Sequence, residues 1–335
     1  MLKPVTALRR QTRLADMGVI RVQGADAIKF LQGQVSNDVA KLAAHVSVLA
    51  GLHNAQGRAI ALLRLVLASD DEVLAILPRE LAGVVATRLA KFVLRAKAKV
   101  SDASLEWEIS GIESGGVAGE MAGAPIGTAR RDEDGSLWVR LGDAPVRWLV
   151  ASRAHGSAMP AQRAPTDTVE PFAAKASEPA RVSDDPSMSR DEWRTFDIAD
   201  GLPQVYAATS EAFVAQMLNL DVVGGIAFDK GCYTGQEVIA RAHYRGKVKR
   251  RMQRFRTAGT SSLKPGDSGT LRDGRNFKVV DAATLGDGRC EFLAVTTLSG
   301  GSAGTDDGAE DPARSSSGVA VLDAEPLPLP YSLPT

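Results

Sequence analysis

The chain has 335 residues, 44% of them hydrophobic, and its 40 lysines and arginines balance its 40 aspartates and glutamates. This length exceeds one typical hydrophobic core, so we expect two or three domains. The balanced charge provides no global field of the kind that marks a nucleic-acid binder. Two cysteines and the lack of a secretory apolar segment point to the reducing cytoplasm and to a protein without a disulfide framework.

Metal and nucleotide motifs are missing from the sequence. Two Cys and four His show neither CxxC nor HxxxH spacing, whereas a structural zinc or an iron–sulfur cluster takes about four such ligands. Neither a GxSxG nucleophile nor a GxxxxGK[ST] phosphate loop occurs. The apolar run at 60–69 is interrupted by Arg64 and is too short for a membrane span. We therefore expect no membrane segment and no metal held by this chain alone.

The N-terminal half alternates strand and helix patterns. The expected elements are a strand at 17–22, a capped helix begun by Gly24-Ala25-Asp26, strands at 59–68 and 73–77, and a helix at 80–92. The two strands join in a hairpin at Asp70-Asp71. This succession of two strands and a helix indicates an α+β unit rather than a doubly wound sheet.

The C-terminal half is richer in short strands. Further strands are expected at 137–141 and 146–151, and a helical stretch is expected at 210–220. Between about 156 and 191 the composition turns to Ala, Pro, Ser and Asp, which predicts a linker or mobile loop. After residue 252, short strands separated by glycine turns predict a small barrel or sandwich. The 299–318 insert has no apolar residue larger than alanine and is predicted to be disordered.

The candidate chemistry is concentrated between Asp229 and Arg251, in the sequence DKGCYTGQEVIARAHYRGKVKRR. Cys232 lies between Gly231 and Tyr233, and two glycines in this short octet predict a tight turn or a close approach of another segment. Nearby positive charge favours the ionised form of a thiol. The alternative is a small buried cysteine in a turn that leads into a helix.

The residues that follow Cys232 also have two interpretations. Glu237 to Ala242 predicts a helix whose first turn favours a carboxylate, so Glu237 has a purely structural explanation. An ion pair between Glu237 and Arg241, four residues on, would explain both without function. The cations between Asp229 and Arg256 would suit a polyanion such as a phosphate, a polyglutamate tail or RNA.

These residues resemble the YgfZ family, which comprises folate-binding relatives of the aminomethyltransferase of the glycine cleavage system. The octet KGCYTGQE, followed by VIAR and YRGK, is similar to the family signature. Four further blocks resemble the family in the expected order: GADA with FLQGQ and ND at 24–38, NAQGR at 54–58, FVAQMLNLD at 213–221, and Leu329-Pro330-Tyr331.

The resemblance implies an α+β fold around a central opening. Its aminomethyltransferase-like, folate-binding body would hold two α+β modules in residues 1–245, and a C-terminal β-barrel would follow in residues 246–335. The opening would bind tetrahydrofolate or a derivative. The implied role is assembly or repair of iron–sulfur enzymes, including enzymes that modify tRNA, and these clients or assembly proteins would be the partners.

The resemblance also implies a set of site residues. Cys232 would be the functional thiol, with Lys230 as its neighbour. The expected folate contacts are Tyr233, Gly235, Gln236, Glu237 and Arg241 of the signature, together with Asn37, Asp38 and Asn54 of the N-terminal blocks.

Two departures from the family pattern bear on function. Asp197 stands where many relatives carry an arginine. The NAQGR turn continues into IALL, without the carboxylates that aminomethyltransferases place there. General-base chemistry on a methylene-folate needs a positioned carboxylate, so we expect a folate-binding factor rather than a true transferase.

Two other functions stay open. One is a tetrahydrofolate-dependent aminomethyl or one-carbon transferase. The other is an RNA-binding module that uses the cations between Arg245 and Arg256. RNA modules usually offer stacking platforms, and only Tyr244 and Phe255 accompany these cations. Direct binding of nucleic acid is therefore the least favoured of the three.

Overall fold

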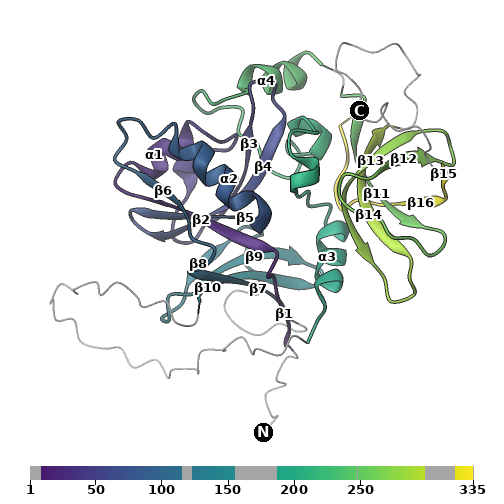
Figure 1. The fold of residues 1–335 in the computed structure, drawn as a ribbon, viewed down its shortest axis with the longest axis horizontal. Helices are drawn as coiled ribbons and strands as arrows, with labels where there is room; N and C mark the ends of the chain where they lie inside the picture. The colour runs from purple at the N-terminus through teal and green to yellow at the C-terminus, as the bar shows by residue number, and fades with distance from the viewer. Residues whose placement is uncertain (1–8, 115–122, 155–186, 247, 299–320, 335) are drawn as a thin grey trace, which may run out of the picture.

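The structure is a computed structural model that describes residues 9–114, 123–154, 187–246, 248–298 and 321–334 (Figure 1). Most of the predicted linker at 156–191 and the whole predicted insert at 299–318 lie outside the described residues. Three sheets organise the described part of the chain. In that part, no helix has the length and apolar character needed to cross a bilayer.

The first sheet contains the predicted N-terminal strands. Its order is β3 (Val48–His53), β4 (Ala59–Ser69), β5 (Glu72–Pro78), β2 (Met17–Gln23) and β6 (Lys99–Asp102). All four pairings are antiparallel, and β4 and β5 form the predicted hairpin. Helix α2 (Arg79–Ala90) packs on this sheet through Leu81, Val85 and Leu89, which recur at the spacing of one helix face.

The second sheet packs against the first. Its order is β1 (Arg9–Arg13), β7 (Trp107–Ser114), β10 (Val146–Arg153), β9 (Leu137–Asp143) and β8 (Ala129–Arg131). A buried cluster joins the two sheets, with Val66 and Ile76 from the first and Val139 and Leu149 from the second. Trp193 belongs to the same cluster, so helix α3 (Arg190–Ala199) is fixed to the second sheet.

The third sheet is the predicted barrel. Its order is β15 (Val321–Leu322), β12 (Ser268–Leu271), β13 (Asn276–Thr284), β14 (Cys290–Thr297), β11 (Arg250–Thr257) and β16 (Ala324–Leu327). The edge strands β15 and β16 are separated in sequence by Asp323 alone. The two edges therefore meet, and the sheet is nearly closed into a barrel.

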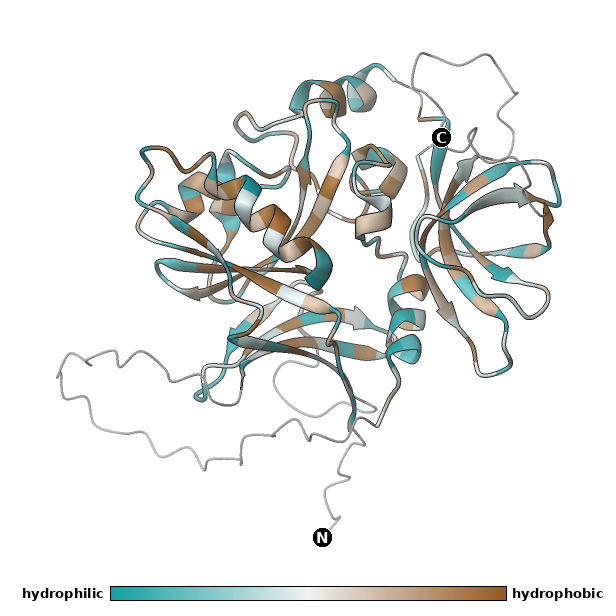
Figure 2. Ribbon diagram, viewed as in Figure 1, coloured by the Kyte–Doolittle hydropathy of each residue, from teal (hydrophilic) through white to brown (hydrophobic). Residues whose placement is uncertain are grey.

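The barrel shares a core with the body. Val280 and Leu293 of the barrel belong to the same buried cluster as Leu63 and Leu218 of the body. Helix α3 lies between the barrel and the second sheet (Figure 1) and contacts β13. Figure 2 shows that its surface is mainly hydrophilic with a short apolar patch, which suits a helix that makes ion pairs on both sides.

The remaining helices are short. They are α1 (Ala27–Gln32), α4 (Gln236–Tyr244) and the 3-10 turns η1 (Val39–Lys41), η2 (Ala207–Thr209) and η3 (Ala215–Leu218). The α+β class, the strands and helices α2 and α4 confirm the sequence predictions.

Two local predictions were wrong. Residues 210–220 form turns and η3 instead of one helix, because Glu211 and Asn219 adopt positive φ angles of 61° and 56° that a right-handed helix excludes. Asp26 occupies the N-cap position of α1 without capping it. Its carboxylate instead accepts the backbone N–H of Lys97 at 2.7 Å, which fastens the helix start to the segment before β6.

Candidate functional site

The signature octet forms a loop that is anchored by Lys230. The ammonium group of Lys230 donates to the backbone carbonyls of Gln32, Val35 and Asn37, each at 2.7 Å. Burial lowers the pKa of Lys230 to about 8, and the charge of Asp38 opposes this effect. Since an ammonium has three N–H donors and no acceptor, this geometry commits all of them to the turn that follows α1.

The loop also packs tightly on the NAQGR turn. Gly235 precedes α4 with a φ of 84°, and a Cβ there would lie 2.5 Å from the carbonyl oxygen of Asn54. The predicted close approach is therefore confirmed at Gly235. A Cβ at Gly231 would meet nothing within 4 Å, so the close approach is made by Gly235 and not by Gly231. The side chain of Asn54 holds its own turn by accepting from the backbone N–H groups of Gln56 and Arg58.

Cys232 is exposed, whereas the other cysteine, Cys290, is buried in the barrel core, and both are free thiols. The alternative of a buried structural cysteine therefore applies to Cys290 and not to Cys232. Burial also raises the pKa of the Cys290 thiol. Thiol reactivity requires access to the sulfur, so of the two cysteines only Cys232 is placed to react with a partner.

Tyr233 points inward from the same loop. Its side chain is buried, and its ring centre lies 5.1 Å from the Lys230 ammonium and 6.5 Å from the ring of His53. Burial raises the pKa of Tyr233 to about 12 and lowers the pKa of His53 to about 4. Both are therefore neutral packing groups near pH 7. Gln236 accepts the backbone N–H of Tyr233 at 3.3 Å and completes the turn.

The other predicted site residues fall into two groups. Asn37 donates to the carbonyls of Leu49 and Gly224, and Asp38 accepts from Gln32 and Ala40, so both hold the loop after α1. Glu237 and Arg241 are exposed on α4. Within the part of the chain that the structure describes, they form no ion pair with each other, so the predicted i,i+4 pair is wrong.

The cations that follow the signature are partly neutralised. Arg251 is buried and binds Asp221 with two hydrogen bonds of 3.0 and 2.9 Å. Arg254 and Arg256 both pair with Glu291, at 2.7 and 2.6 Å. This neutralisation weakens the positive field that an RNA backbone would need.

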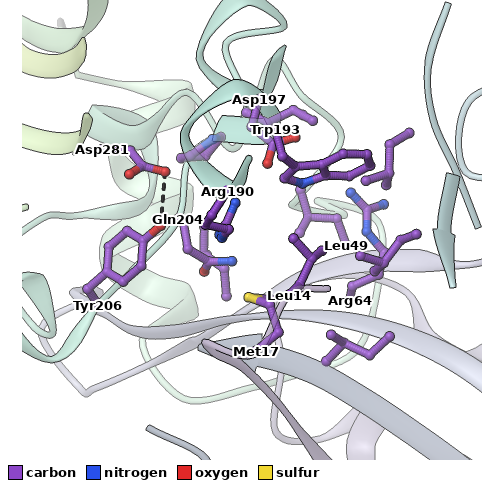
Figure 3. Close-up of a pocket in the computed structure, with 16 residues that line it drawn as sticks. Leu14, Met17, Leu49, Arg64, Arg190, Trp193, Asp197, Gln204, Tyr206 and Asp281 are labelled. Carbon is purple, nitrogen blue, oxygen red and sulfur yellow. Dashed lines mark hydrogen bonds between the residues drawn. The ribbon is translucent and has the colours of Figure 1, made fainter. Parts of the chain in front are cut away.

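A cavity opens where the two body sheets, α3 and the barrel strand β13 meet (Figure 3). Its apolar wall includes Leu14, Met17, Leu49, Leu62 and Trp193. Its polar wall consists of Arg64, Arg190, Asp197, Gln204, Tyr206 and Asp281. None of the predicted site residues lines this cavity among the residues that the structure describes. The octet and the cavity are therefore separate features of the molecule.

Most charged groups of the cavity wall are held by ion pairs. Arg190 binds both oxygens of Asp16 at 2.8 and 3.0 Å. Asp197 accepts from the buried Arg147 at 2.6 Å, and Arg147 also pairs with Asp200. These pairs fasten α3 to the second sheet and to the segment between β1 and β2.

Asp281 is the buried carboxyl group of the cavity. The Tyr206 hydroxyl donates to it at 3.0 Å (Figure 3), and Arg194 lies 3.9 Å away. Burial raises the pKa of Asp281 to about 6, against the lowering effect of Arg194 and Arg190. A carboxyl with that pKa exchanges protons near neutral pH, as a general acid or base must.

Sequence reasoning missed the polar wall of the cavity. Arg64 gave a signal, because it is a charged residue inside an otherwise apolar strand. Asp281 lies within β13, far from the signature, and the sequence pattern did not single it out. Among the described residues, no group of three or more His, Cys, Asp and Glu is arranged to hold a metal ion.

Known proteins share the fold of this chain. Aminomethyltransferase T of the glycine cleavage system from Bartonella henselae matches with a TM-score of 0.58 over 87% of this chain and 79% of its own, at 13% identity. This likeness confirms the expected aminomethyltransferase-like fold.

Sequence comparison supplies the family. No protein-family model matches the chain. The tRNA-modifying protein YgfZ of Edwardsiella ictaluri is 34% identical over 84% of this chain and 83% of its own length. Its namesakes from Cronobacter sakazakii and Yersinia pseudotuberculosis are 29% and 31% identical over 96% and 84% of this chain. The chain therefore belongs to the YgfZ family.

Proposed function

We propose that this protein is a folate-binding tRNA-modification factor that supports the assembly or repair of iron–sulfur enzymes. Tetrahydrofolate or a derivative occupies the cavity between the body and the barrel, and Cys232 supplies a functional thiol at the surface. The observation that carries the proposal is the lining of the cavity, in which an apolar wall faces several convergent polar side chains, a combination found in small-molecule sites. Family membership and the aminomethyltransferase fold support the folate.

In this proposal the signature octet and the cavity have different roles. The octet presents Cys232 on a loop that Lys230 and Gly235 hold rigidly against the body. An exposed thiol on a fixed loop suits contact with a macromolecular partner, such as an iron–sulfur client enzyme or an assembly protein. None of the predicted folate contacts lines the cavity among the described residues, so contact of folate with Tyr233, Gln236, Glu237 and Arg241 stays a prediction separate from binding in the cavity. The same holds for Gly235, Asn37, Asp38 and Asn54.

The thiol is tested by Cys232→Ser beside Cys290→Ala in a strain that lacks the gene. We expect Cys232→Ser to keep tetrahydrofolate affinity within about twofold, because its side chain points to solvent, and to lose support of iron–sulfur enzyme activity. The Cys290→Ala control keeps that support. Full restoration by Cys232→Ser would contradict the thiol, and loss of folate affinity in it would make Cys232 a binding residue instead.

A second function, one-carbon transfer to or from tetrahydrofolate, is favoured by one observation. Asp281 places a buried, protonatable carboxyl on the cavity wall beside Tyr206, and such a group is what general-base chemistry on methylene-folate needs. Incubation of the purified protein with methylene-tetrahydrofolate, ammonia and a dithiol, which together accept the one-carbon unit as an aminomethyl thioether and release tetrahydrofolate, separates the two functions. Release of tetrahydrofolate that stops in Asp281→Asn favours the transferase, and binding without turnover favours the accessory factor.

A further inference from the structure

Arg64 differs from every other charged group on the cavity wall. It projects from the middle of β4, between apolar neighbours, and lines the cavity beside Trp193 (Figure 3). The side chain is partly buried, and burial lowers the pKa of its guanidinium to about 10. It nevertheless keeps accessible surface, and the space that it lines is the cavity. The guanidinium therefore faces the interior of the binding site.

Among the described residues, Arg64 forms no hydrogen bond and no ion pair. Asp197 is the carboxylate whose charge acts on Arg64. That carboxylate already accepts from Arg147 at 2.6 Å. The other arginine of the wall, Arg190, is bound by both oxygens of Asp16. Both arginines thus line the cavity, but Arg190 is paired with a carboxylate and Arg64 is not.

The guanidinium of Arg64 carries five N–H donors and no acceptor, and among the described residues no side chain or carbonyl takes any of them. Because the side chain keeps accessible surface, these donors are open to the space of the cavity. Stability alone gives no reason to keep such a group inside an apolar strand. A ligand that satisfies the donors when it enters the cavity does give a reason, since binding sites often trade stability for function.

We propose that Arg64 is the ligand-binding cation of the cavity and that it takes a planar oxygen acceptor of the bound molecule, either a carboxylate or a ring oxo group. The planar fork of a guanidinium donates two parallel N–H bonds to the two oxygens of a carboxylate, and it can donate one N–H bond to the single oxygen of an oxo group. This inference rests on the proposed folate function, because tetrahydrofolate offers both acceptors: the oxo group of its pterin ring and the carboxylates of its glutamate tail.

The experiment compares Arg64→Met and Arg64→Lys with the wild-type protein. A matched control, Arg21→Met, removes a cation from β2 of the same sheet, where Arg21 pairs with the partly exposed Glu106. Calorimetry measures the affinity for tetrahydrofolate, for 6-methyltetrahydropterin, which lacks the tail, and for p-aminobenzoylglutamate, which lacks the pterin. Thermal unfolding measures the Tm of each protein without ligand.

Arg64→Met is expected to weaken tetrahydrofolate binding about tenfold or more, as the loss of a charge-assisted hydrogen bond does, and to leave the ligand-free Tm equal to or above that of the wild type. Arg64→Lys should keep part of the affinity, and Arg21→Met all of it. An effect that persists with 6-methyltetrahydropterin assigns Arg64 to the ring oxo group. An effect confined to p-aminobenzoylglutamate and tetrahydrofolate assigns it to a carboxylate.

Three outcomes would overturn the inference. Equal tetrahydrofolate binding by wild type and Arg64→Met overturns it while the folate function stands. A ligand-free Tm several degrees lower in Arg64→Met, with unchanged affinity per folded molecule, makes Arg64 a structural cation. Failure of the wild-type protein to bind any of the three probes refutes the folate function, and the inference falls with it.

Discussion

At the scale of single residues, the position of Asp281 depends on an irregularity of its strand. The pairing of β13 with β14 shifts register between Val279 and Asp281. Val279 packs in the barrel core, whereas Val280 belongs to the cluster shared with the body and Asp281 lines the cavity. In a regular strand, neighbours point to opposite faces. The bulge lets Val280 and Asp281 both reach the body.

The raised pKa of Asp281 predicts how stability depends on pH. Below about pH 4 the carboxyl is protonated in both folded and unfolded chains. Between about pH 4 and its folded pKa of about 6, only the folded protein keeps the proton, so the free energy of unfolding falls as pH rises. Relative to Asp281→Asn, the wild-type protein should lose about 2 kcal/mol of stability between pH 4 and pH 7.

Urea unfolding at several pH values measures this difference for Asp281→Asn. The control is Asp70→Asn, in the exposed turn between β4 and β5, which should follow the wild-type curve. Arg194, Arg190 and Tyr206 all face Asp281. The pH range over which stability changes therefore depends on all four side chains. A stability difference that does not change with pH would show that the pKa of Asp281 is the same in the folded and unfolded protein.

At the scale of elements, the octet is a loop fastened at two points rather than an open binding surface. Lys230 fixes its start to the turn after α1, and Gly235 fixes its end to the turn before β4. Between these points, Tyr233 is buried and Cys232 is exposed. The rigid loop limits the directions from which a partner can approach the thiol.

Lys230→Met should therefore loosen the loop. It removes the donor for three backbone carbonyls, and we expect the free energy of unfolding to fall by about 2 kcal/mol, because accessible water replaces only part of the lost bonding. Lys41→Met is the matched control, since Lys41 is exposed and forms only a surface ion pair with Asp38, and it should cost less than about 0.5 kcal/mol.

Urea unfolding and amide hydrogen exchange check this prediction. In Lys230→Met the amides of residues 33–37 and 231–235 should exchange faster, whereas the barrel amides should keep their protection. Equal stability of the two lysine variants would mean that the carbonyls find other donors, and Lys230 would then be free to act on a ligand.

At the scale of the whole molecule, the segment FVAQMLNLD joins the body to the barrel. Asn219 donates to the carbonyl of Met252 in β11 at 2.9 Å, and Asp221 binds Arg251 of the same strand. At the other end of the barrel sequence, the Tyr331 hydroxyl donates to the carbonyl of Gly201 at 2.7 Å. We propose that the boundary between body and barrel lies near residue 245, after α4.

The Arg251–Asp221 pair should be the strongest single link between the two parts. Both side chains are buried, so Asp221→Asn leaves a charged guanidinium without its partner and should cost about 3–5 kcal/mol. Asp273→Asn breaks an Arg–Asp pair with Arg275 in an exposed barrel turn, and should cost less than about 1 kcal/mol. Chemical denaturation compares the two; equal losses would contradict a role for burial in this link.

The sequence by itself determined the family, the α+β class and most strands, because these follow from local patterns such as the octet, strand alternation and turn glycines. It also placed Cys232 in a glycine turn before a helix, and the structure has this arrangement. It did not determine the irregular segment at 210–220, where positive φ angles at Glu211 and Asn219 override helical spacing.

Only the tertiary structure decided what forms the cavity. Arg64, Asp197 and Asp281 come from β4, α3 and β13, and no pattern within a short segment relates them. Their proximity arises because two sheets, a helix and a barrel share cores that bring distant segments together. Likewise, Lys230 and Tyr233 are adjacent to Cys232 in sequence but point inward to hold the loop, since burial and backbone carbonyls, not sequence distance, set the direction of each side chain.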